Sequence, residues 1–126
     1  MIDKNVKILV VDDNELIRTL FRLSFKKIPE IELYEAENGS EGLKQFEELN
    51  PDIVFTDIMM PGEIDGINLC KQIKASVHKC LVILISAKGQ QSDIDLGMAA
   101  GADLYKVKPL SPKDLINIAT EVISKN

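Results

Sequence analysis

The sequence has few cysteines, no long apolar run and no excess of positive charge, and each of these absences excludes a class of protein. Its two cysteines, Cys70 and Cys80, are too few for the disulfide framework of a small secreted domain. The longest apolar runs, such as Leu81–Ile85, reach only about five residues, whereas a membrane-spanning helix needs about 20. The N-terminal residues MIDKNVK lack the apolar core of a signal peptide, so we expect a cytoplasmic protein.

The charge balance and the composition describe an ordinary globular domain. Twenty acidic residues against 15 basic ones give a formal net charge of -5, which argues against direct binding to nucleic acid or to an anionic membrane. Hydrophobic residues make up 45% and charged residues 28% of the chain, which excludes a disordered or collagen-like protein. A length of 126 residues, without a Ser/Gly linker or an internal repeat, predicts a single domain over residues 1–126.

Five short apolar or β-branched runs recur along the chain, and each is followed by a stretch with the spacing of an amphipathic helix. The runs KILVV, DIVFT and LVILI are apolar almost without alternation, as in strands that helices cover on both faces, whereas IELYEAEN alternates like an edge strand. This pattern predicts an α/β fold, namely a three-layer doubly wound five-stranded parallel sheet. The predicted strands are Lys7–Val11, Ile31–Ala36, Ile53–Thr56, Leu81–Ile85 and Asp103–Val107.

Polar residues follow four of the five predicted strands, at the point where each strand ends. Asp12 and Asp13 follow the first strand, Asp57 the third, Ser86 the fourth and Lys108 the fifth. In an open parallel sheet these ends meet at one edge, where ligands bind. Converging carboxylates repel one another unless a cation lies among them. Because the ligands are hard oxygens, the pattern favours Mg²⁺, or Mn²⁺, over Zn²⁺.

Each of these residues also has a simpler interpretation when it is taken alone. Asp12, Asp13 and Asn14 precede a predicted helix, so any one of them could cap it. Asp57 could begin a turn, and Lys108 could be a charged turn residue before the last helix. The combination of all of them at one sheet edge favours a functional site.

One other group of residues has the chemistry of metal ligands. Cys70, His78 and Cys80 offer three soft donors, and no fourth lies in obvious reach along the sequence. We therefore expect two core thiols and a surface histidine rather than a structural zinc site.

Four segments, VDDN, FTDIMMPGEIDG, LISAKG and GADLYKVKPL, resemble the response-regulator receiver domains of two-component signalling. The resemblance covers essentially the whole chain. It implies a flavodoxin-like fold with strand order 2-1-3-4-5. It also implies a signalling module that modifies only itself, rather than an enzyme with a turnover substrate.

The resemblance implies a role for each residue at the predicted sheet edge. Asp57 would accept a phosphoryl group from a phosphohistidine on a partner histidine kinase or phosphotransfer protein. Asp12 and Asp13 would hold Mg²⁺ together with Asp57 and the backbone carbonyl of Met59. Lys108 would contact the phosphoryl oxygens. Phosphoryl transfer needs chiefly positioning and charge neutralisation, which this set of groups can supply.

A second set of implied roles concerns the response to phosphorylation. Ser86 would move to hydrogen-bond a phosphoryl oxygen, and Tyr105 would swing inward. The face made by the fourth helix, the fifth strand and the fifth helix would then change and select a downstream protein partner. The Lys108–Pro109 bond would be cis. One departure is a loop that is one residue longer than usual between Pro61 and Asp65, which leaves the start of the third helix open.

Three alternatives stay open beside this interpretation. The chain could be a receiver fragment of a larger regulator or of a hybrid kinase. An aspartyl-nucleophile phosphatase would share the fold and the Mg²⁺, but it needs a second aspartate two residues after Asp57, where Met59 stands. An FMN-binding flavodoxin would need a Ser/Thr/Gly-rich loop after the first strand, where the chain has DDNE.

Overall fold

The computed structural model describes residues 5–125, in which five strands alternate with five helices. The strands form one parallel sheet in the order β2-β1-β3-β4-β5, so the predicted fold and strand order are confirmed. The elements are β1 (Val6–Val11), α1 (Glu15–Phe25), β2 (Ile31–Ala36), α2 (Gly39–Leu49), β3 (Ile53–Asp57), α3 (Gly66–Ala75), β4 (Leu81–Ser86), α4 (Gln91–Ala99), β5 (Leu104–Val107) and α5 (Pro112–Lys125).

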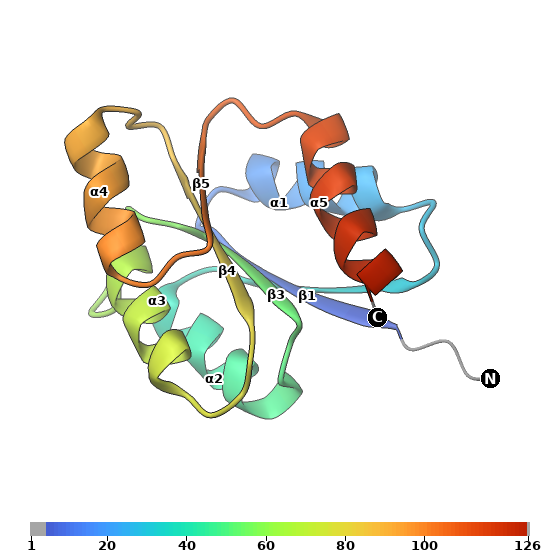
Figure 1. The fold of residues 1–126 in the computed structure, drawn as a ribbon, viewed down its shortest axis with the longest axis horizontal. Helices are drawn as coiled ribbons and strands as arrows, with labels where there is room; N and C mark the ends of the chain where they lie inside the picture. The colour runs from blue at the N-terminus through green and yellow to red at the C-terminus, as the bar shows by residue number, and fades with distance from the viewer. Residues whose placement is uncertain (1–4, 126) are drawn as a thin grey trace.

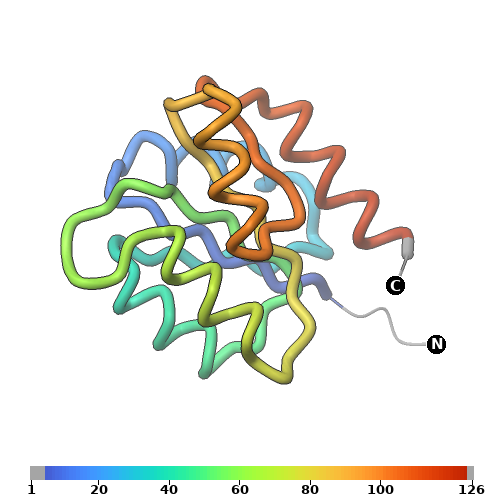
Figure 2. Tube along the Cα trace, turned by 60° about the vertical axis from the view of Figure 1, so that its left-hand side comes forward, coloured from blue at the N-terminus to red at the C-terminus, as the bar shows by residue number. Residues whose placement is uncertain are grey.

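The helices cover the sheet on both faces, as the apolar strands require. Helices α1 and α5 lie side by side on one face, and α2, α3 and α4 lie on the other (Figures 1 and 2). Each layer has its own core. Phe21, Phe55 and Leu115 belong to the core beneath α1 and α5, whereas Phe46 and Leu69 belong to the core beneath α2 and α3. Burial of these side chains is the main stabilising term of the fold.

The central strands are the ones whose sequence is apolar without alternation. All five residues of β3 are buried, and so are five of the six in β4. The alternating run IELYEA forms β2 at one edge of the sheet, where all of its residues except Ala36 are only partly buried. The predicted strand boundaries differ from the observed ones by at most one residue, because turn residues mark them clearly.

Local signals also fix the helix starts that the sequence left open. Helix α3 begins at Gly66 because the side chain of Asp65 accepts a hydrogen bond from the Asn68 amide, at 2.8 Å. The longer loop before it includes Gly62, whose φ of 103° suits a residue without a Cβ atom. None of the helices in residues 5–125 combines the length and the apolar character needed to span a bilayer.

Candidate functional site

The carboxyl ends of β1, β3, β4 and β5 meet at one edge of the sheet, and their polar residues gather there. Asp12 and Asp13 directly follow β1, Asp57 is the last residue of β3, and Lys108 directly follows β5. One carboxylate oxygen from each of the three aspartates lies within 4.8 Å of the others. The structure therefore brings together the acidic residues that the sequence places at strand ends.

The three carboxylates differ in exposure and in how they are held. Asp12 is fully buried, Asp57 is 8% exposed and Asp13 is exposed. The Oδ1 atom of Asp12 accepts a hydrogen bond from the Asn14 amide at 2.9 Å. Its buried Oδ2 atom has no hydrogen-bond partner among the described residues. A buried carboxylate oxygen without a hydrogen-bond donor can serve as a ligand to a cation.

Lys108 is the cation of the cluster. Its Nζ atom lies 3.5 Å from Asp12 Oδ2 and 3.6 Å from Asp57 Oδ1, which are ion-pair distances rather than good hydrogen bonds. The Lys108 amide donates to the Ser86 carbonyl at 2.8 Å, which ties the lysine to the end of β4. The Lys108–Pro109 bond is cis, as expected.

The backbone of Asp57 is held closely from behind. Helix α3 starts with Gly66, and a Cβ atom there would come within 2.0 Å of the Asp57 carbonyl oxygen. Only glycine allows this approach. The Thr56 hydroxyl also donates to that oxygen at 3.0 Å, and the Ile58 amide donates to the Ile85 carbonyl at 3.1 Å. The aspartate is therefore fixed on a rigid, buried strand end.

The environment makes the ionised carboxylates unfavourable. Burial raises the pKa of Asp57 above its ordinary value, and the charges of Asp12 and Asp13 raise it further, against the attraction of Lys108. Burial likewise raises the pKa of Asp12, where the Asn14 amide and Lys108 partly compensate. One lysine does not offset three carboxylates, so the site has room for a further positive charge.

The donor set suits a hard divalent cation. Three carboxylates offer oxygen ligands within one small volume, and the buried Asp12 Oδ2 atom has an ion pair with Lys108 but no hydrogen-bond donor among the described residues. Mg²⁺ prefers this chemistry and keeps several water ligands, which the exposed side of the site can supply. Beside the carboxylates lies a shallow hollow lined by Ile58, Met59, Met60, Pro61 and Asp65.

The residues implied in the response to phosphorylation lie on the neighbouring strands. Ser86 is 3% exposed, and its Oγ atom accepts from the Lys88 amide at 3.0 Å. The Tyr105 hydroxyl donates to the Lys88 carbonyl at 2.8 Å, and its ring is half-buried. Met59 is 62% exposed and Lys88 is exposed, so both side chains reach solvent.

The structure also tests whether the aspartates cap α1 and whether the cysteines and His78 form a zinc site. Asn14 caps α1, since its side chain accepts from the Leu16 amide at 2.8 Å, so neither Asp12 nor Asp13 is needed as the cap. His78 Nε2 lies 2.7 Å from the Pro51 carbonyl. Cys70 and Cys80 are free and buried, and burial raises the pKa of the Cys70 thiol to about 11. The metal-competent group in the described residues is therefore the aspartate cluster.

One buried residue near the site was missed in the sequence. Arg18 lies on the buried stripe of α1 with Phe21 and Phe25, and its guanidinium donates to the Asp12 carbonyl at 2.7 Å. The i, i+3, i+7 spacing of these residues was a usable signal, because an arginine on an apolar stripe needs a buried partner.

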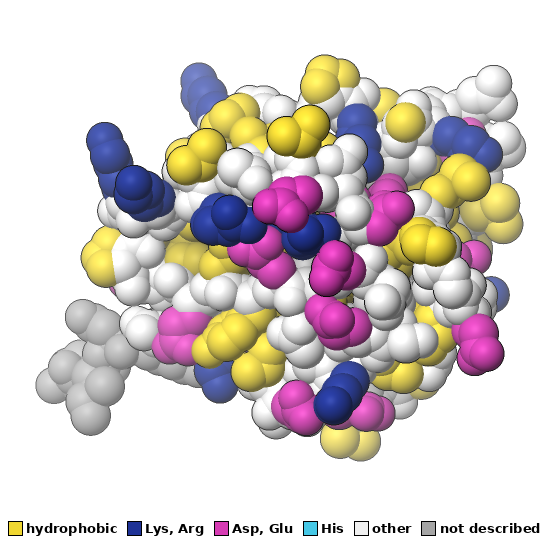
Figure 3. Space-filling view, turned by 180° about the vertical axis from the view of Figure 1, so that it is seen from behind, with side chains coloured by type: hydrophobic (Ala, Val, Ile, Leu, Met, Phe, Trp, Pro, Cys, Tyr) yellow, Lys and Arg dark blue, Asp and Glu magenta, His cyan; other side chains and the backbone are white. Residues whose placement is uncertain are grey.

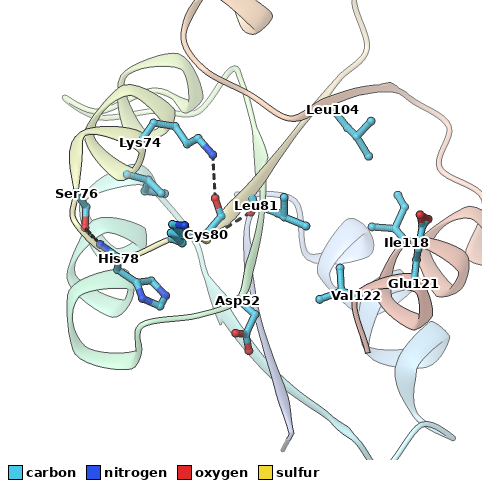
Figure 4. A pocket seen from close by; sticks show the side chains of 12 residues that line it. Asp52, Lys74, Ser76, His78, Cys80, Leu81, Leu104, Ile118, Glu121 and Val122 are labelled. Atoms are coloured by element: carbon cyan, nitrogen blue, oxygen red, sulfur yellow. Dashed lines mark hydrogen bonds between the residues drawn. The ribbon is translucent and has the colours of Figure 1, made fainter. Parts of the chain in front are cut away.

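A cavity lies away from the carboxylates, at the amino ends of β3, β4 and β5 (Figure 4). It has a volume of about 700 Å³, and Leu81, Leu104 and Val122 line its apolar part. Lys74 at its rim already donates to the Cys80 carbonyl at 3.0 Å and pairs with Asp103 at 2.9 Å. Lys74 is therefore held by contacts within the fold.

The surface of the molecule shows no concentration of one charge on the side seen in Figure 3. Acidic, basic and apolar side chains are mixed across that face. This distribution agrees with the modest net charge of -5 and offers no basic patch on that face for nucleic acid.

Sequence comparison connects this geometry to known proteins. The chain is 38% identical over 111 residues to the alkaline phosphatase synthesis transcriptional regulatory protein PhoP of Bacillus subtilis. It is 41% identical over 110 residues to the transcriptional regulatory protein ResD of the same organism. These alignments cover 88% and 87% of this chain but 45% of each relative, so the chain spans about half the length of the curated relatives it matches.

Solved structures give the same answer at the level of the fold. The receiver domain of the Francisella response regulator 1452 matches with a TM-score of 0.86 and 30% identity, over 96% of this chain and 98% of that one. The Vibrio cholerae chemotaxis protein CheY4 matches with a TM-score of 0.84 and 23% identity, over 94% and 98% of the two chains. A family model for the response regulator receiver domain matches residues 8–120. The resemblance seen in the sequence is confirmed, and the chain belongs to the family of response regulator receiver domains.

Proposed function

We propose that Asp57 accepts a phosphoryl group from a phosphohistidine on a sensor histidine kinase or a phosphotransfer protein. In this reaction the P–N bond to the histidine breaks, an O–P bond to the Asp57 carboxylate forms, and the imidazole leaves. The convergence of three carboxylates and one lysine at the end of a buried strand is the observation that supports this proposal most strongly. Receiver domains are phosphoacceptors with autophosphatase activity, which agrees with it.

The metal in this proposal is Mg²⁺, held by Asp12, Asp13, Asp57 and the backbone carbonyl of Met59. When bound, it would neutralise the charge that develops on the phosphoryl oxygens. The buried and unsatisfied Oδ2 atom of Asp12 supports the assignment. Protonation removes carboxylate ligands, so binding weakens as the pH falls.

Lys108 and Ser86 complete the proposed phosphoryl site. Lys108 lies 3.6 Å from Asp57, close enough for its ammonium group to pair with a phosphoryl oxygen attached there. Ser86 carries a hydroxyl donor at the end of the adjacent strand. Both groups would face the negative charge of a phosphoryl group on Asp57, and this attraction would stabilise the phosphorylated state.

The output in this proposal is a change of the face made by α4, β5 and α5. Ser86 and Tyr105 already share a link, because the Lys88 backbone donates to one and accepts from the other. Movement of Ser86 toward the phosphoryl group would therefore reach Tyr105 on β5. A downstream protein, rather than nucleic acid, would read this face. The module acts on no turnover substrate, so we do not class it as an enzyme.

The surroundings of the domain are also part of the proposal. We assign residues 1–126 to one receiver domain in the cytoplasm, on the strength of the family. Because the relatives PhoP and ResD are about twice as long and are transcriptional regulatory proteins, a receiver within a longer regulator is the second candidate.

Intact-mass measurement after incubation with acetyl phosphate and Mg²⁺ tests the proposed function. We expect a labile gain of one phosphoryl group in the parent protein and none in Asp57→Asn. Asp52→Asn is the matched control, because it removes the same charge at the opposite end of β3. A parent protein that gains no phosphoryl group, or an Asp57→Asn variant that still does, contradicts the proposal.

A further inference from the structure

Arg18 is a buried charged residue for which the proposed phosphoryl chemistry has no direct use. Its side chain is only 8% exposed, although arginine is rarely buried without partners. It lies in the first turns of α1, close to the acidic cluster. The Arg18 guanidinium and a bound Mg²⁺ would repel each other. The position of Arg18 beside the proposed magnesium site therefore needs a structural explanation.

The contacts of Arg18 join three elements. One Nη atom donates to the Asp12 carbonyl at 2.7 Å, which is short and charge-assisted. The Nε atom lies 3.3 Å from a carboxylate oxygen of Glu35 on β2, and the other Nη atom lies 3.4 Å from Glu15. The guanidinium thus links the end of β1 to β2 and to α1.

The Asp12 carbonyl lies beyond the end of the sheet ladder. Strand β1 ends at Val11, and the Asp12 amide makes the last strand-like bond, to the Ala36 carbonyl at 3.0 Å. Within the described residues, the carbonyl of Asp12 has no such partner in the sheet, and the Arg18 guanidinium donates to it instead. That oxygen belongs to the planar peptide between Asp12 and Asp13, so holding it fixes the direction in which Asp13 leaves.

We infer that Arg18 is a positioning residue for the magnesium site: its bond to the Asp12 carbonyl orients the peptide that presents the Asp13 carboxylate. This inference rests on the proposed function. Asp13 is exposed, with little packing to hold it, so its placement depends on the backbone that precedes it. Residues that orient metal ligands commonly change metal affinity by about 10–100-fold when they are removed.

The charge of Arg18 acts in the opposite direction from its proposed positioning role. Removing a cation near Mg²⁺ relieves repulsion, so a purely electrostatic role predicts tighter Mg²⁺ binding in Arg18→Met. Loss of positioning predicts weaker binding. The sign of the change therefore separates the two explanations.

Arg22 provides a matched control. It binds the same Glu35 carboxylate with two hydrogen bonds, of 2.8 and 2.9 Å, and its side chain is 52% exposed. Its two bonds go to Glu35, not to Asp12. Arg22→Met thus removes the same charge and an anchor on the same carboxylate, and it leaves the Asp12 peptide untouched.

Calorimetric titration with Mg²⁺ alone, on the folded full chain at pH 7, tests the inference. We expect Arg18→Met to bind Mg²⁺ at least about tenfold more weakly than the parent, and Arg22→Met to bind as well or slightly more tightly. Far-UV circular dichroism establishes that each variant is folded. Equal or tighter binding by folded Arg18→Met overturns the inference.

A more conservative pair of variants, with lysine in place of each arginine, tests the inference if Arg18→Met does not fold. Lysine keeps a positive charge at position 18, but without the fork geometry of arginine it cannot hold the Asp12 carbonyl while it is anchored to Glu35, so the Asp12 peptide is held less firmly. We therefore expect Arg18→Lys to lose several-fold in affinity and Arg22→Lys to lose none; equal affinities for this pair refute the positioning role. Asp13→Asn shows whether a negative result contradicts only the role of Arg18 or also the proposed function. If the parent fails to bind Mg²⁺, or if Asp13→Asn binds as the parent does, the proposed function falls as well.

Discussion

Removing the charge of Asp57 is expected to stabilise the metal-free protein. Asn has nearly the same shape as Asp, so Asp57→Asn keeps the packing of β3 and removes a carboxylate that burial makes unfavourable. Burial and the charges of Asp12 and Asp13 both raise the pKa of Asp57. A residue kept in this environment reduces stability, as functional sites often do.

The size of the gain follows from the charges around Asp57. At an effective dielectric constant of about 20, repulsion from an Asp12 oxygen that lies no more than 4.8 Å away costs at least about 3.5 kcal/mol, and attraction across 3.6 Å to Lys108 returns about 4.6 kcal/mol. The exposed Asp13 is screened by water and adds about 1 kcal/mol of repulsion. The repulsion from the two aspartates is therefore not outweighed by Lys108, and the desolvation of the buried carboxylate, which is the largest cause of the raised pKa, also opposes the ionised form. We expect Asp57→Asn to raise the free energy of unfolding by about 1–2 kcal/mol.

Urea denaturation at pH 7 with a chelator measures this gain. The chain has no tryptophan, so far-UV circular dichroism is the suitable signal. Asp52→Asn is the control, because its carboxylate accepts from the Lys7 amide at 2.9 Å and its loss should give no gain. With Mg²⁺ at 100 times the dissociation constant, the parent should gain about 2.7 kcal/mol and the variant less. The reasoning is wrong if metal-free Asp57→Asn is no more stable than the parent.

Three further predictions concern pH, packing and lifetime. The folded state raises the pKa of Asp57 above its ordinary value of 3.8. The protonated carboxyl therefore contributes to the free energy of unfolding at pH values below 3.8, and this contribution is lost as the pH rises through the folded-state pKa. The stability difference between Asp57→Asn and the parent should therefore vanish in acid and grow toward neutral pH in chelator-containing urea titrations. Gly97→Ala should lose about 1–3 kcal/mol, because the new Cβ atom would lie 2.8 Å from Leu84 and 2.9 Å from Tyr105; unchanged thermal unfolding would argue against this packing. Met59→Asn combined with Lys88→Glu should release phosphate several-fold faster at saturating Mg²⁺, since each added water contact is worth about 1 kcal/mol of barrier. An unchanged release rate means that these two side chains do not set the lifetime.

The fold could be predicted almost completely from the sequence because its signals are local and repeated. Short β-branched runs such as LVILI are typical of strands covered on both faces, and the alternation of IELYEAEN is typical of an edge strand. The strand order itself came from the family resemblance, since periodicity does not say which strands are neighbours. The start of α3 was left open because the loop after Pro61 has an extra residue, and the capping by Asp65 resolved it.

The candidate site could be predicted as a set of residues but not as a geometry. Parallel strands deliver their last residues to one edge, so Asp12, Asp57 and Lys108 could be grouped from their positions alone. The unequal burial of the carboxylates could not be predicted, because it depends on the close approach of Gly66 and on packing between layers. The burial of Arg18 could have been predicted from its place on the apolar stripe of α1, but its partner could not, because the sequence does not mark which backbone carbonyls need donors.

Mapping of the phosphorylated residue tests the central claim most directly. The protein is incubated with acetyl phosphate and Mg²⁺, reduced with borohydride, which converts an aspartyl phosphate to homoserine, and then digested and sequenced by mass spectrometry. The claim predicts homoserine at position 57 alone, and none when Mg²⁺ is chelated. Homoserine at Asp12, Asp13 or Asp52, or unmodified Asp57 under conditions in which the intact protein gains a phosphoryl group, would contradict it.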